Sequence, residues 1–196
     1  MSDIDENDLP EEPPRRPLRL DWIFPLFIRP GKTLKAIAES DGPSWLAPIL
    51  LLSLLAIVFT LVAAPLRTQE ALSRPPEMPP DFQYWSPEMQ QDYLNANQPN
   101  TSPLMMTILP GLGALVSVWA GWFILGAVLH LGLTMSGGRG SRSADFNLAA
   151  WASLPFAVRS LVQIVAMLAT RQLISSPGLS GFIPADASGF TAYMAI

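Results

Sequence analysis

The chain has 196 residues, room for one domain of ordinary size, and 49% of them are hydrophobic while only 14% are charged. An average soluble domain has about 25% charged residues, so this composition, with a mean hydropathy of +0.30, indicates a membrane protein. A net charge of −4 excludes an overall basic field for nucleic acid, a single histidine excludes a multi-histidine metal site, and the lack of cysteine excludes disulfides and thiolate metal sites. We therefore expect no metal, cofactor or nucleic-acid partner.

The N-terminal region predicts two segments outside the bilayer. Residues 1–17 are acidic and proline-rich with few apolar side chains, so we expect a disordered tail. Residues 18–43 are predicted to form an interfacial amphipathic segment. Its first part, "LRLDWIFPLFIRP", is too short to span and combines aromatic and cationic residues, which favour the headgroup zone. Its second part, "GKTLKAIAES", predicts a short amphipathic helix.

Residues 44–196 are predicted to form the transmembrane helical domain, beginning with a span at about 44–64. This stretch carries no charge and is long enough to cross about 30 Å of hydrocarbon. A polar outer loop at 65–103 follows, in which "SPEMQQDYLNA" predicts a helix with Ser86 as N-cap and Pro87 at the first helical position. We expect the loop's aromatic residues to cover the membrane surface; a partner contact is the alternative.

The second apolar run, 104–135, is longer than a bilayer is thick. Pro110 and Gly111 mark a break, so the span is predicted at about 111–133. Gly113, Ser117 and Gly121 repeat every four residues, and small side chains on one face let another helix approach closely. These three are the candidate helix-packing residues.

The next turn, "SGGRGSRSADF", is glycine-rich and basic. Arg139 and Arg142 are candidate contacts to lipid headgroups or a partner. We predict that Ser143 caps the following helix, with Asp145 in its first turn. His130, near the end of the second span, is expected to lie at headgroup level or pack against a helix.

The third span, at about 147–174, contains Arg159, a third candidate for lipid or partner contact. If the span begins at Phe146, Arg159 lies about 20 Å deep and needs a partner from another chain or a further segment. If Pro155 breaks the helix, Arg159 lies in the first turn of a span at 156–174 and reaches the headgroups. We favour the second placement, because no acid lies inside any apolar run.

Lysine and arginine residues predict the orientation. Six of them precede the first span: Arg15, Arg16, Arg19, Arg29, Lys32 and Lys35. By the positive-inside rule the N-terminus and the Arg139 turn are expected in the cytoplasm and the loop 65–103 outside. The expected location is the cytoplasmic (inner) membrane.

Two stretches resemble the Yip family of multi-pass membrane proteins, in its bacterial branch. They are "FIRPGKTLKAIAESDGPSWLAPILLL" and "SGGRGSRSADFNLAAWASLPF", and the resemblance covers roughly residues 27–169. It implies four or five spans, no known enzymatic activity, and partners among integral membrane proteins, such as the ABC-type exporters that some bacterial relatives accompany. The Asp-Leu-x-Gly-Pro signature of eukaryotic members is absent.

The fold class expected is an all-α, polytopic transmembrane helix bundle with at least three spans. The final "GFTAYMAI" resembles the start of another apolar segment, so the chain could be an incomplete copy of a four- to five-span protein. We expect a non-enzymatic scaffold or accessory subunit that binds the lipid bilayer and organises other membrane proteins. The alternative is a transporter or channel component with a polar path near Arg159, Gln163 and His130.

Overall fold

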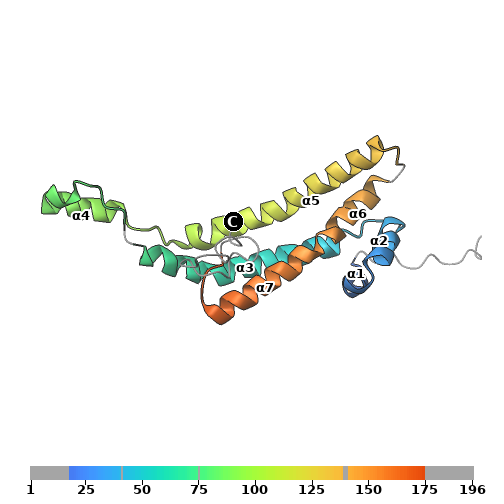
Figure 1. The fold of residues 1–196 in the computed structure, drawn as a ribbon, viewed down its shortest axis with the longest axis horizontal. Coiled ribbons are helices and arrows are strands. Elements are labelled where there is room, and N and C mark those ends of the chain that lie inside the picture. Colours follow the sequence, from blue (N-terminus) through green and yellow to red (C-terminus); the bar gives the residue numbers. More distant parts are fainter. Residues whose placement is uncertain (1–17, 41, 75, 139–140, 175–196) are drawn as a thin grey trace, which may run out of the picture. The chain divides into compact units, whose positions relative to one another are not determined.

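The computed structural model describes residues 18–40, 42–74, 76–138 and 141–174, and all regular structure within these ranges is helical. Three helical stretches are long and apolar enough to cross a membrane: Leu46–Ser73, Leu104–Met135 and Arg142–Thr170. The predicted all-α, multi-pass fold is therefore confirmed (Figure 1). The predicted disordered tail 1–17 and the apolar segment near the C-terminus lie outside the described residues.

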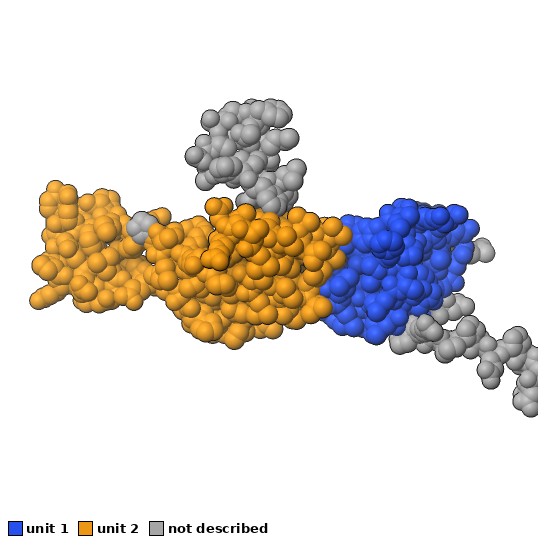
Figure 2. Space-filling view, turned by 90° about the horizontal axis from the view of Figure 1, so that it is seen from below, with its two compact units in different colours: residues 1–52, 118–155 blue, residues 53–117, 156–196 orange. Residues whose placement is uncertain are grey.

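The chain divides into two compact units, coloured separately in Figure 2. Unit 1 comprises residues 1–52 and 118–155, and unit 2 comprises residues 53–117 and 156–196. The three long helices contribute to both units, and the short N-terminal helices belong to unit 1.

Unit 1 begins with a short 3-10 turn, η2 (Leu20–Trp22), followed by helices α1 (Ile23–Ile28) and α2 (Pro30–Ala38). The predicted amphipathic helix is α2. Its residues Thr33 and Ile37 are buried, whereas Lys35 and Glu39 form an exposed ion pair one turn apart. Since α2 packs against α6 (Arg142–Ala152), its apolar face contributes to the core of unit 1.

The first long helix, α3 (Leu46–Ser73), extends well past the predicted end of the first span at residue 64. It passes through Pro65, which removes one main-chain hydrogen bond without ending the helix. The beginning of the predicted loop 65–103 is therefore helical. An ion pair between Arg74 and Glu70 lies at the end of α3.

The second apolar run is helical from end to end. It starts with a π-helical turn, η4 (Leu104–Ile108), and continues as α5 (Leu109–Met135). The expected break at Pro110 and Gly111 is wrong, and what changes there is the hydrogen-bond register. Pro110 has no N–H to donate to the carbonyl four residues back, and directly before it the Leu109 N–H bonds five residues back, to Leu104 O.

The third apolar run is two helices, because α6 ends at Ala152 and α7 (Leu154–Thr170) begins after Ser153. The helix break that we expected near Pro155 is thus present, and Pro155 is the second residue of α7. The predicted cap is wrong by two residues. Ser141, extended at φ −77° and ψ 145°, caps α6 by accepting a hydrogen bond from the Ala144 N–H, so Ser143 lies within the first turn.

In unit 2, the core joins the middle of α3 to the end of α7. Ala63, Met167 and Ile174 are buried there, with Phe59 and Leu66 packed against them. The chain leaves α7 at Arg171, whose left-handed φ of 55° ends the helix.

The polar loop of unit 2 contains the predicted capped helix, α4 (Pro87–Ala96), with Ser86 accepting a hydrogen bond from the Met89 N–H. Before it lies a 3-10 turn, η3 (Phe82–Tyr84). The rings of Phe82, Trp85 and Tyr93 contact one another at 5.4–5.7 Å between centroids. Three of the loop's four aromatic side chains are therefore used to fold the loop, while Tyr84 remains 80% exposed.

Candidate functional site at the start of the first span

The centre of unit 1 is a fully buried amide, Asn147 of α6. Its Oδ1 accepts hydrogen bonds from the main-chain N–H groups of Ser44 at 2.9 Å and Trp45 at 3.1 Å. Its Nδ2 donates to Gly42 O at 2.8 Å. One side chain thus satisfies three main-chain groups of the non-helical segment that leads into α3, groups that would otherwise be costly to bury. We call this the Asn147 lock.

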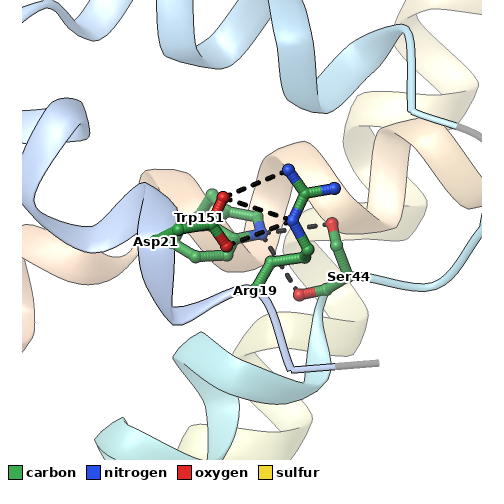
Figure 3. A network of polar contacts seen from close by, with 4 residues as sticks. All are labelled: Arg19, Asp21, Ser44 and Trp151. Atoms are coloured by element: carbon green, nitrogen blue, oxygen red, sulfur yellow. Dashed lines mark hydrogen bonds and ion pairs between the residues drawn. The ribbon is translucent and has the colours of Figure 1, made fainter. Parts of the chain in front are cut away.

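A second contact one turn along α6 holds the same segment. The indole Nε1 of Trp151 lies 3.2 Å from both Ser44 O and Ser44 Oγ. Figure 3 shows these two contacts. The Trp151 ring also meets Trp22 edge-on, with 5.6 Å between centroids. Arg19 stacks over Trp22 at 3.9 Å. Its guanidinium also bonds the Asp21 carboxylate, as Figure 3 shows. The N-terminal helices, the start of α3 and the end of α6 are therefore joined at one point.

Aromatic rings attach α5 to the same segment. Trp45 stacks on Trp122 at 4.6 Å, and Trp119 meets both rings edge-on. The Trp122 Nε1–H donates to Phe146 O at 3.1 Å. At Gly126, one turn further along α5, a Cβ atom would lie only 2.7 Å from the Phe146 ring. The absence of a side chain at Gly126 is what lets α6 approach α5 this closely.

The one histidine of the chain is paired. His130 Nδ1 of α5 lies 2.7 Å from Asp145 Oδ2 in the first turn of α6, and the Asp145 side chain is only 3% exposed. A carboxylate this buried requires a hydrogen-bonding partner, and the first turn of a helix favours negative charge. His130 therefore fastens α6 to α5, and it is a helix-packing residue in unit 1, one of the two roles we predicted.

We expect His130→Ala to lower the free energy of unfolding by about 1–3 kcal/mol, because the Asp145 carboxylate stays buried without the imidazole. Asp145→Asn should lower the free energy of unfolding by less, since the asparagine amide can still form a hydrogen bond with the His130 imidazole. Thermal unfolding in detergent measures both, with Thr134→Ala, one turn along α5, as the control. Equal melting temperatures for all three variants would show that the pair contributes nothing.

The predicted packing residues lie on an open part of α5. A Cβ at Gly113 or Gly121 would meet nothing within 4 Å among the described residues. Ser117 is exposed, and its hydroxyl donates to Gly113 O at 2.8 Å. The described part of the chain leaves this face free, and its packing role stays a prediction.

The predicted lipid or partner contacts are spread over both units. Arg142 is the exposed first residue of α6 in unit 1, and Arg139 lies outside the described residues. In unit 2, Arg159 is exposed in the second turn of α7 and Gln163 is half-buried one turn later. The membrane depth of Arg159 stays a prediction, as does the polar path of the transporter alternative.

Sequence reasoning missed Asn147 and Trp151 as residues that organise unit 1, and it placed Asp145 in the first turn of a helix without its partner His130. Asn147 bonds a segment more than 100 positions away, and nothing local marks it. The sequence did carry a signal for the contact between Asp145 and His130. Asp145 is the one acid beside the third apolar run, His130 is the one histidine, and the two lie on either side of a short turn.

These features define a multi-pass helical membrane protein in which the Asn147 lock joins α6 to the segment that leads into the first span. A family model described as the Yip1 domain matches residues 24–196, and the chain belongs to this family of membrane proteins. Comparison with curated proteins and with solved structures found no match.

Proposed function

We propose that this protein is a non-enzymatic scaffold or accessory subunit that binds and organises other membrane proteins. The observation that carries the proposal is the exposure of its second long helix. In the most apolar 18-residue stretch of Leu104–Met135, only 6% is buried within the protein. The corresponding stretch of α3 is 39% buried. A helix that the described part of its own chain leaves so uncovered has most of its surface available to lipid or to another protein.

The small-residue face of α5 is the part of this surface that suits a protein partner. Between apolar helices in a membrane, association depends on close packing rather than on a hydrophobic driving force, so small side chains are the favourable contact points. Gly113 and Gly121 leave open space, and Ser117 satisfies its hydroxyl within its own helix. A second helix could therefore pack here without leaving a polar group unpaired.

Location and orientation belong to the same proposal. The positive-inside rule supports a cytoplasmic N-terminus in the inner membrane, with the loop that carries α4 on the outer side. The partners would then be integral membrane proteins of a larger complex, such as an exporter.

Substitutions on the small-residue face test the proposal. We expect Ser117→Leu and Gly121→Leu to lose co-purifying membrane partners in gentle detergent by tenfold or more, equivalent to about 1.4 kcal/mol, because a leucine side chain blocks close approach. Ser117→Gly should keep them. Val116→Leu, about 100° round the helix and already exposed, is the matched control. Wild-type partner recovery in both Ser117→Leu and Gly121→Leu would contradict the proposal.

A further inference from the structure

Five of the six tryptophans of the chain gather in unit 1 around the first residues of α3. Trp45 contacts Trp119 and Trp122 on α5, and Trp151 contacts both Ser44 and Trp22. Tryptophan concentrates where hydrocarbon meets headgroups, because its ring is apolar and its N–H is polar. Trp119 is 40% exposed, and Trp22, Trp45 and Trp122 are half-buried, so four of the rings present a surface to the surroundings.

We infer that these tryptophans are the surface by which unit 1 binds the phospholipid headgroup layer, and that the hydrocarbon core ends at their level. It follows that α5 leaves the hydrocarbon near Trp122 and not near residue 133, where the sequence alone puts the end of the span. The last part of α5, all of α6 and the helices α1 and α2 then form an interfacial layer. This inference does not depend on the proposed function.

Three helices of the chain reach the boundary of the hydrocarbon together. Leu46 begins α3 beside Trp45, and Leu154 begins α7 shortly after Trp151. The stacking of Trp45 on Trp122 and the bond from Trp151 to Ser44 bring all three helices to one level within unit 1. From Leu104 to Trp122 the helix is about 28 Å long, which fits a hydrocarbon core of about 30 Å.

The charged and non-helical groups of unit 1 also favour a boundary at the tryptophans. If the hydrocarbon reached residue 133, the start of α3 would lie about 16 Å inside it. The segment Gly42–Trp45 is not helical, and its Pro43 is exposed. Non-helical backbone is tolerated in hydrocarbon only where protein covers it, and Pro43 is not covered. The exposed ion pair between Lys35 of α2 and Glu39, the residue after α2, would also be immersed, whereas at the headgroups both are solvated.

The N-terminal helices beyond the tryptophans present an amphipathic surface. Large apolar side chains are exposed on α1 at Phe24, Phe27 and Ile28. Exposed cations follow them at Arg29, Lys32 and Lys35. Helices of this kind lie in the headgroup layer, with apolar side chains inserted about 5–10 Å and cations against lipid phosphates.

Spin labels on α5 test the boundary, and the absence of native cysteine makes single-cysteine variants straightforward. The full chain, labelled at Leu112, Val116, Ile124, Val128 or Leu131, is reconstituted in vesicles of phosphatidylethanolamine and phosphatidylglycerol. All five positions are exposed. Labels at Leu54 and Glu88 calibrate the hydrocarbon and the aqueous phase. Collision with oxygen is compared with collision with a water-soluble nickel chelate.

We expect the ratio of oxygen to nickel collisions to be highest at Leu112 and Val116 and to fall about an order of magnitude by Leu131, since the two ends differ by about 28 Å along the helix. A collision ratio that is highest at Ile124, and as high at Val128 as at Val116, would overturn the inference.

A second measurement uses the fluorescence of the native tryptophans in unit 1 and needs no label there. Trp85→Phe removes the one tryptophan of the loop, and brominated lipids then quench only the five in unit 1. Bromine near the top of the acyl chain should quench more strongly than bromine near its end. The reverse order would also overturn the inference.

Discussion

Replacing Asn147 by alanine is expected to lower the free energy of unfolding by about 2–4 kcal/mol, because three main-chain groups lose their partner in a place without water. Asn147 is fully buried, and it bonds the N–H groups of Ser44 and Trp45 and the carbonyl of Gly42. The amide protons of Ser44 and Trp45 should also exchange faster with solvent. Thermal unfolding in detergent and hydrogen exchange measure the two effects.

A variant of matched volume separates the Asn147 lock from general core damage. Asn147→Leu keeps nearly the same side-chain volume and removes all three hydrogen bonds, so its loss of stability should be close to that of alanine. Asn95→Ala, on an exposed position of α4, should be neutral. A leucine variant as stable as the wild type would mean that the hydrogen bonds of Asn147 are not what stabilises this region.

The second large effect is expected at Gly126, where alanine should cost about 1–3 kcal/mol. Its Cβ would lie 2.7 Å from Phe146 Cδ1 and 2.9 Å from Cε1. The Phe146 ring has little room to retreat, because Trp122 and Phe123 pack against it at 5.6 and 5.7 Å between centroids. Melting temperature in detergent is the measurement.

Two comparisons make the Gly126 prediction specific. Gly132→Ala, also on α5 but with nothing within 4 Å of its Cβ, should be neutral or slightly stabilising, because alanine favours the helix. Combining Gly126→Ala with Phe146→Leu should recover part of the loss, which a double-mutant cycle detects. A Gly126→Ala variant as stable as Gly132→Ala would show that the two helices do not depend on this contact.

The elements that could be predicted from sequence are those whose signals are local. Uncharged apolar runs mark the long helices, and Ser86 followed by Pro87 marks the start of α4, because the cap and the helix that it begins are adjacent. The amphipathic period of α2 is equally local. The same locality explains the error at α6, where Ser141 and Ser143 both offer a capping hydroxyl and only the backbone conformation distinguishes them.

The organisation of unit 1 could not be predicted, because it depends on pairs distant in sequence. An asparagine in "DFNLAAW" looks like any helical polar residue until the segment at residues 42–45 is placed against it. Gly126 lies in a mixture of small and large residues that suits packing against other helices, but the four-residue repeat of Gly113, Ser117 and Gly121 is the stronger local signal. Among the described glycines, an added Cβ would meet its closest neighbour at Gly126, outside that repeat.

The most direct test of the proposed scaffold role is photo-crosslinking from α5 in native membranes. A photoreactive amino acid is placed at Ser117 in one variant and at Val116 in the other, both of them exposed positions. We predict a discrete adduct with an integral membrane protein from position 117, lost when Gly121→Leu is added, and mainly lipid adducts from position 116. Lipid adducts alone from both positions would contradict the proposal that this face binds a protein partner.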